Sequence, residues 1–186
     1  DESGWMPALA FGLRDFAGTG LLTSEYVVAT KTLTDSLRVT GGMGWGRTGS
    51  YNGFTNPLCA ISDKFEVRPA NDYGQGGVPS WNQYFRGDAA LFAGVEYKLN
   101  PKTTMIVEYS SDAYTSEVAN GSFDHESPLN FGLVWEPKDN YQFGLYSLYG
   151  SDLGLSFTAI LNPASPGMPG GYDPSPVPVA VRSADA

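Results

Sequence analysis

Two stretches of alternating apolar and polar residues, joined by a short turn, lie in the middle of the chain. Residues 86–99 and 103–112 each place large apolar side chains on one face and mostly charged or small ones on the other. The apolar face consists of Leu91, Ala93, Val95, Tyr97, Leu99, Met105, Val107 and Tyr109. Phe92 and Ile106 are apolar exceptions on the polar face. Each stretch is roughly 10–12 residues, longer than an ordinary soluble strand and close to the ~9–11 residues that cross a bilayer in a tilted barrel.

The same alternation predicts six further strands, which gives about eight antiparallel strands in this chain. They are residues 7–16, 21–33, 37–48, 127–137, 141–150 and 153–162. In residues 21–33, Tyr26 and Val28 are assigned to the apolar face, opposite Glu25 and Lys31. In residues 37–48, glycines recur on the polar face, which indicates a crowded or sharply curved wall.

The predicted connections differ in length according to the end of the sheet at which they lie. Residues 49–85 form the longest, and residues 34–36, 100–102 and 138–140 form tight turns that all fall at the opposite end. Tight periplasmic turns with longer outer loops are the pattern of outer-membrane barrels. The fold prediction is therefore an up-and-down transmembrane β-barrel over 7–162, with 49–85 as an outer loop. Residues 1–6 are predicted as a linker and 163–186 as a Pro/Gly-rich periplasmic linker or tail.

A soluble lipocalin-like barrel or a β-sandwich that binds a small ligand would show the same alternation, with the apolar face inward. The aromatic residues favour the membrane alternative, because girdles of aromatic side chains lie at both interfaces of outer-membrane barrels. The residues assigned to such girdles are Tyr26, Trp45, Tyr97, Tyr109, Trp135, Tyr141 and Tyr149.

Composition excludes several other classes of protein. The net charge of −9 argues against a nucleic-acid partner. The sequence contains no apolar run of ~18 residues, so no membrane-spanning helix is predicted. Cys59 is the only cysteine, so no disulfide can form within the chain.

The candidate chemistry is binding rather than catalysis. His125 is the only histidine, and its neighbours Asp124, Glu126 and Ser127 are adjacent in sequence rather than separately positioned as a catalytic triad requires. We therefore expect no enzymatic activity, no metal site and no cofactor. An outer-membrane enzyme that acts on lipid or glycan remains a third alternative.

Two sets of residues could contact a hydrated polymer. A polar track in the lumen is predicted from Arg14, Glu25, Lys31, Arg38, Asp88, Glu96, Lys98, Glu108, Asp112 and Glu136. Loop aromatics that could stack on sugar rings are Tyr51, Phe54, Phe65, Tyr73, Trp81, Tyr84 and Phe85. The alternatives are that the charges pair with one another and plug the interior, and that the aromatics only pack the loop onto the rim.

Several segments together resemble the YjbH-like family of exopolysaccharide (group 4 capsule-type) outer-membrane proteins. They are PALAFGLRDFAGTGLLTSEYVVATK, GGMGWGR, YFRGDAALFAGVEY, EYSSDAY and LVWEPKDNYQFGLYSLYGSDLGLSF, spread over residues 5–163. The resemblance implies a β-barrel in the outer membrane of a Gram-negative bacterium that functions in polysaccharide secretion. It also implies that this chain is one segment of a longer polypeptide. The expected partners are outer-membrane lipid, polysaccharide, other export proteins and the rest of the same polypeptide.

Overall fold

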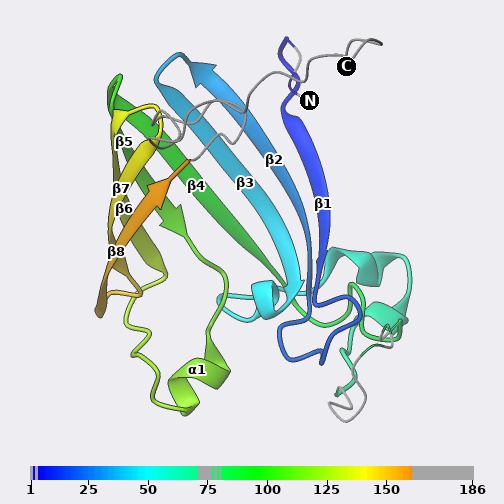
Figure 1. The fold of residues 1–186 in the computed structure, drawn as a ribbon. Helices are drawn as coiled ribbons and strands as arrows, with labels where there is room; N and C mark the ends of the chain where they lie inside the picture. The colour runs from blue at the N-terminus through cyan, green and yellow to red at the C-terminus, as the bar shows by residue number, and fades with distance from the viewer. Residues whose placement is uncertain (1, 3, 71–76, 78, 80, 161–186) are drawn as a thin grey trace, which may run out of the picture.

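Eight antiparallel strands form one sheet, in which each strand pairs with its neighbours in chain order (Figure 1). The structure is a computed structural model that describes Glu2, residues 4–70, Gly77, Pro79 and residues 81–160. The strands are β1 (Ala8–Arg14), β2 (Ser24–Thr34), β3 (Leu37–Gly46), β4 (Ala89–Asn100), β5 (Thr103–Tyr109), β6 (Leu129–Lys138), β7 (Tyr141–Leu148) and β8 (Asp152–Ala159). The predicted all-β class, strand number and up-and-down order are confirmed. The predicted tail, 163–186, lies outside the described residues.

The two ends of the sheet differ, as the connection lengths predict. At the tight-turn end, short turns join β2 to β3, β4 to β5 and β6 to β7. At the loop end lie the longer connections, which carry the 3₁₀ helices η1 (Arg47–Gly49), η2 (Pro57–Ala60) and η3 (Asp63–Phe65) and the short helix α1 (Thr115–Ala119) (Figure 1). The functional side chains discussed below cluster at this loop end.

Each tight turn is accompanied by a shift in strand register. The shifts lie beside Thr34, Asn100 and Lys138. Local side chains close two of these turns: Thr34 Oγ1 accepts from the Leu37 amide at 3.0 Å, and Asn100 Oδ1 accepts from the Lys102 amide at 2.9 Å. Such bulges increase local twist and fix the register of the following strand.

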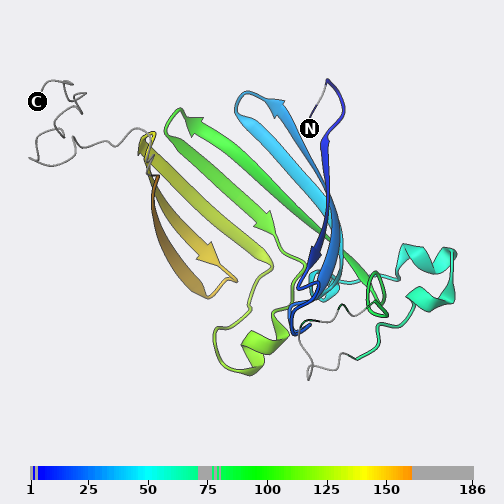
Figure 2. The same ribbon diagram turned by 45° about the vertical axis from the view of Figure 1, so that its right-hand side comes forward.

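The sheet curls strongly but does not close into a barrel within the described residues. β1 and β8 are its two edges, and no pairing between them is present among the described strands (Figure 2). Of the predicted barrel, the structure therefore shows an open, curved antiparallel sheet, and closure is not seen among the described residues. Within the part of the chain that the structure describes, no helix is both long and apolar enough to cross a membrane.

The strand register sorts the side chains onto two faces. On the outer face, Val95 lies opposite Val39 and Val107, and Leu145 lies opposite Leu133 and Leu155. On the inner face, glycines and polar residues alternate with a few aromatic rings. The inner face is concave, because a single cavity is bordered by side chains of strands as far apart as β1 and β5.

The distribution of exposure between the faces is the reverse of that in a soluble protein. Along β6, the outer-face residues Leu133 and Trp135 are 40% and 50% exposed. The inner-face residues Asn130 and Val134 of the same strand are only 6% and 8% exposed. Large apolar side chains of this strand therefore point into the surroundings of the sheet, while Asn130 and Val134 lie inside its curve.

Candidate functional site: the inner face and its loop-end cover

The inner face carries charges of both signs. The residues of the predicted polar track that the register and the cavity lining place there are Arg14, Arg38, Glu96, Lys98 and Glu108. Arg38 lies directly opposite Glu96, and Arg38 Nη1 is 3.6 Å from Glu96 Oε2, with both side chains about half exposed. A hydrated chain could contact these groups without a large desolvation cost.

The assignment of Glu25 and Lys31 to the polar track is wrong. Glu25 lies opposite Leu13 and Trp45, so it belongs to the outer face, and Lys31 shares that face. The error arises because Tyr26 is apolar in character yet points inward, opposite Gly12 and Gly44. Tyr26 is consequently not part of an outer aromatic girdle. A large ring fits on the inner face only because its neighbours there are glycines.

Three other members of the predicted polar track lie at the ends of the sheet. Asp88 is exposed immediately before β4, and Asp112 follows β5 in the connection to α1. Glu136 lies near the tight-turn end, where Glu136 Oε1 accepts from Gln142 Nε2 at 2.8 Å. The predicted track is therefore shorter in the structure and ends in a polar cluster at the loop end.

Aromatic rings on the inner face lie directly over glycines. A β-carbon built on Gly12 would lie 2.2 Å from Cζ of Tyr26, and one on Gly42 would lie 2.2 Å from Cζ of Phe92. The Tyr26 and Phe92 rings meet edge to face, with centroids 6.3 Å apart. The glycines thus leave room for the tip of each ring beside the backbone of the neighbouring strand.

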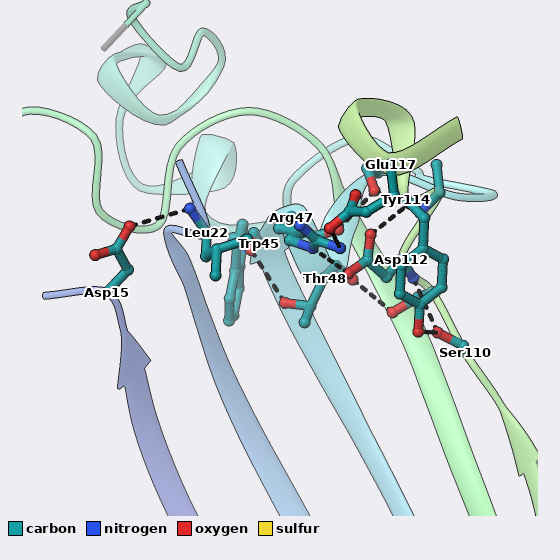
Figure 3. A network of polar contacts seen from close by, with 12 residues as sticks. Asp15, Leu22, Trp45, Arg47, Thr48, Ser110, Asp112, Tyr114 and Glu117 are labelled. Carbon is teal, nitrogen blue, oxygen red and sulfur yellow. Dashed lines mark hydrogen bonds and ion pairs between the residues drawn. The ribbon is translucent and has the colours of Figure 1, made fainter. Parts of the chain in front are cut away.

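A clamp of charged and aromatic residues covers the inner face at the loop end (Figure 3). Arg47, immediately after β3, forms an ion pair with Asp112 through Nε and one with Glu117 of α1 through Nη2 at 2.7 Å. Its guanidinium lies over the Tyr114 ring, 5.3 Å from the centroid. The Tyr114 amide donates to Asp112 Oδ1 at 2.8 Å. The clamp fixes the β5–β6 connection to the end of β3.

The charges in the clamp are mutually stabilised. Burial alone would lower the pKa of Arg47, but the hydrogen bonds to Asp112 and Glu117 outweigh it and raise the pKa. Burial alone would raise the pKa of Glu117, but the hydrogen bond from Arg47 holds that pKa below its ordinary value. Both groups are therefore charged near neutral pH, and the ion pair between Arg47 and Glu117 is formed there.

The later described part of the long β3–β4 connection lies against the outer face, through Arg68 and Phe85. Arg68 forms two hydrogen bonds with the fully buried Glu25 carboxylate, at 2.8 and 2.9 Å, and the Phe85 amide donates to the same carboxylate at 2.9 Å. The Phe85 ring stacks on Phe11 at 5.7 Å and meets Trp45 at 5.2 Å. We call residues 56–70 and 81–88 the strap. Its contacts explain why a carboxylate is tolerated at position 25 on an apolar face.

Most of the predicted loop aromatics pack within the protein. Tyr51 contacts the ring of His125, and the Tyr84 hydroxyl donates to the Phe16 carbonyl at 2.7 Å. Phe54 is fixed by a two-way backbone bridge with Ala89, but the residue is 39% exposed. Phe65 is half-buried in η3, and Tyr73 lies outside the described residues. Trp81 differs, because it is 71% exposed while its edge contacts the Phe16 and Tyr84 rings.

His125 belongs to an aromatic cluster. Its ring meets Tyr51, Tyr114 and Tyr149 at 5.3, 5.5 and 6.4 Å between centroids. Phe123 stacks on Tyr149 at 4.2 Å. Tyr149 therefore packs inside the loop end and is not on the predicted outer girdle.

Several residues of this site are absent from the sequence-based prediction. Arg47, Arg68 and Tyr114 act through partners 43 to 70 positions away in the sequence, and no local pattern reports such contacts. Phe92 does carry a local signal, since it is an apolar exception on a polar face.

The fold and the loop-end site define an antiparallel β-sheet protein with an apolar outer face and a polar inner face. The chain belongs to the YjbH family, described as exopolysaccharide biosynthesis protein YbjH, which it matches over residues 1–186. The resemblance seen in the sequence is thereby confirmed.

One curated relative is the uncharacterized lipoprotein YjbH of Escherichia coli (strain K12). It is 36% identical to this chain over 164 residues. The match covers 84% of this chain and 23% of the relative, so the chain spans about a quarter of the relative's length. No solved structure matches the chain significantly.

Proposed function

We propose that this chain forms part of the wall of an outer-membrane β-barrel in an exopolysaccharide or capsule secretion system, with a structural or transport role rather than a catalytic one. The observation that carries the proposal is the reversed distribution on β6, where Leu133 and Trp135 are exposed and Asn130 is buried. Lipid would cover the outer face, and the inner face would meet a hydrated lumen.

The aromatic residues at the tight-turn end support a membrane interface there. On the outer face, the Trp135 and Phe143 rings are 5.6 Å apart, Phe143 and Phe157 are 5.0 Å apart, and Tyr141 stacks on Phe157 at 6.1 Å. A continuous band of rings at one end of the strands is typical of the headgroup boundary. A soluble ligand-binding barrel would instead bury such rings inside.

The family and the relative support the cellular setting. The description of the family names exopolysaccharide biosynthesis. The E. coli relative is named a lipoprotein, and that name fits a place in the cell envelope. A closed barrel of ~8 strands has an interior just filled by side chains. We therefore propose that further strands of the longer polypeptide, or another subunit, pair with β1 and β8 to widen the wall.

A pair of adjacent substitutions tests the proposal. Val95 points outward near the middle of β4, whereas a side chain at Gly94 would point inward into open space, with only the Val107 carbonyl oxygen within 4 Å. Val95→Arg should lower stability in lipid by about 2–4 kcal/mol, and Gly94→Arg should be tolerated. The measurement is urea unfolding of the full-length protein folded into phosphatidylcholine vesicles. Greater damage from Gly94→Arg would reverse the assigned faces, and a protein monodisperse without detergent would refute the membrane proposal.

A further inference from the structure

A cavity of about 250 Å³ lies on the inner face just beneath the loop-end clamp. It is bordered by Arg14 of β1, Tyr26 of β2, Phe92 of β4, Glu108 of β5 and Tyr114 before α1. Its wall therefore combines five segments that come together only through the curvature of the sheet. Residues of the clamp, Asp112 among them, form its upper border.

The apolar part of the cavity is a set of aromatic rings held in fixed positions. Tyr26 and Phe92 are pressed against Gly12 and Gly42 and contact each other edge to face. Tyr114 is held by the Arg47 guanidinium and by a 3.3 Å hydrogen bond between its hydroxyl and Ser110 Oγ. Rings that are already immobile lose little conformational entropy when an apolar surface stacks on them.

The polar part of the cavity offers one donor group and one acceptor group. Arg14 and Glu108 make no hydrogen bond or ion pair with any other described residue, and both side chains are exposed. A guanidinium supplies five N–H donors, and a carboxylate supplies only acceptors. Together they can satisfy both the acceptor and the donor character of vicinal hydroxyl groups.

We propose that this cavity is a binding subsite for one sugar ring of a polysaccharide. Ring faces that stack on the C–H face of a pyranose, beside a free carboxylate and guanidinium for its hydroxyls, fit a carbohydrate rather than a lipid or a peptide. The volume is slightly below the ~300–1,000 Å³ typical of small-molecule pockets, so it accommodates a single ring of a longer chain. The inference rests on the proposed function, because it supplies a contact for polysaccharide inside the lumen.

Binding to a defined probe tests the subsite. The probe is the exopolysaccharide precipitated by ethanol from cultures of the source bacterium and shortened by partial acid hydrolysis. Titration calorimetry with the full-length protein in detergent measures its affinity, and polyethylene glycol of similar length serves as a chain without rings. We expect Tyr26→Leu and Glu108→Gln each to weaken binding about tenfold, whereas Tyr26→Phe should retain it.

Matched controls use the same substitutions away from the cavity. Tyr146→Leu removes a ring that lies over Gly132 and Gly144, and Glu136→Gln removes a carboxylate at the tight-turn end that accepts from Gln142. Neither lies in the cavity, so both should leave the affinity unchanged. Wild-type protein that does not bind the probe, or binding that survives both Tyr26→Leu and Glu108→Gln, overturns the subsite. Insertion of the same preparations into vesicles is measured in parallel: failure to insert refutes the membrane proposal, while insertion without binding refutes the subsite alone.

Discussion

At the scale of single residues, the structure separates positions by the face on which they lie. Adjacent residues such as Gly41 and Gly42 have opposite environments although they are chemically identical. A β-carbon on Gly41 would have no neighbour within 4 Å, whereas one on Gly42 would lie 2.2 Å from the Phe92 ring and 2.8 Å from the Val27 carbonyl oxygen. Substitutions at neighbouring positions are therefore the sharpest probes of the fold.

Gly42→Ala should destabilise the protein by about 1–3 kcal/mol, because a clash with a backbone oxygen cannot be relieved by rotating the Phe92 ring alone. Gly41→Ala should be neutral or slightly stabilising, since alanine loses less backbone entropy on folding. Urea unfolding midpoints in detergent compare the two variants. Equal midpoints would mean that Phe92 does not lie over Gly42.

The buried carboxylate of Glu25 makes a second prediction at this scale. Arg68→Met removes its guanidinium partner and leaves a charge buried on an apolar face, so we expect a loss of about 3–5 kcal/mol. Arg68→Met combined with Glu25→Leu removes both charges and should recover part of that loss. Unfolding free energies of the single and double variants provide the measurement. A double variant no more stable than Arg68→Met would show that the pair does not anchor the strap.

At the scale of elements, the alternation of apolar and polar residues and the lengths of the turns are sufficient to predict most of the fold. The number of strands, their order and the three tight turns follow from local alternation, and the structure confirms them. The predicted inner and outer faces of β2 are wrong because Tyr26 points inward. It does so because it lies between glycines of β1 and β3, and the local sequence of β2 carries no information about these neighbours. The sequence does not predict the position of the strap. Its main contact joins Arg68 to Glu25, 43 positions apart, and the segment that carries Arg68 shows no alternation of apolar and polar residues.

The clamp between α1 and β3 predicts a dependence on acid. The pKa of Glu117 is lowered in the folded protein from its ordinary value of 4.5, so its contribution to stability is complete above that pH. As pH falls below 4.5 and through the folded pKa, Glu117 binds a proton and the contribution is lost. Limited proteolysis of residues 110–128 from pH 7 to pH 3 should show increasing cleavage, using an acid-tolerant protease such as pepsin at the lower end. Glu117→Gln should raise cleavage already at pH 7 and flatten the profile. An unchanged profile in Glu117→Gln would exclude this ion pair as the acid-sensitive contact.

At the scale of the whole molecule, the sheet has a clear polarity. The strap, α1 and the aromatic cluster around His125 all lie at the loop end, and the three tight turns lie at the other (Figures 1 and 2). The proposed function sets this polarity across the outer membrane, with the loop end outside the cell. In that orientation the strap holds the outer rim to β1 and β2 through Phe85 and Arg68.

Thiol labelling tests that orientation in intact cells. Cys59 is a free, partly exposed cysteine in η2 at the loop end, whereas Lys102 lies in the tight turn between β4 and β5. In cells that express the full-length protein, a membrane-impermeant maleimide should label Cys59 directly, because Cys59 and the reagent lie on the same side of the outer membrane. Lys102→Cys in a Cys59→Ala background should be labelled only after the outer membrane is permeabilised, and Cys59→Ala alone sets the background signal. Labelling of Lys102→Cys in intact cells, with Cys59 reached only after permeabilisation, would place the strap in the periplasm and reverse the proposed orientation.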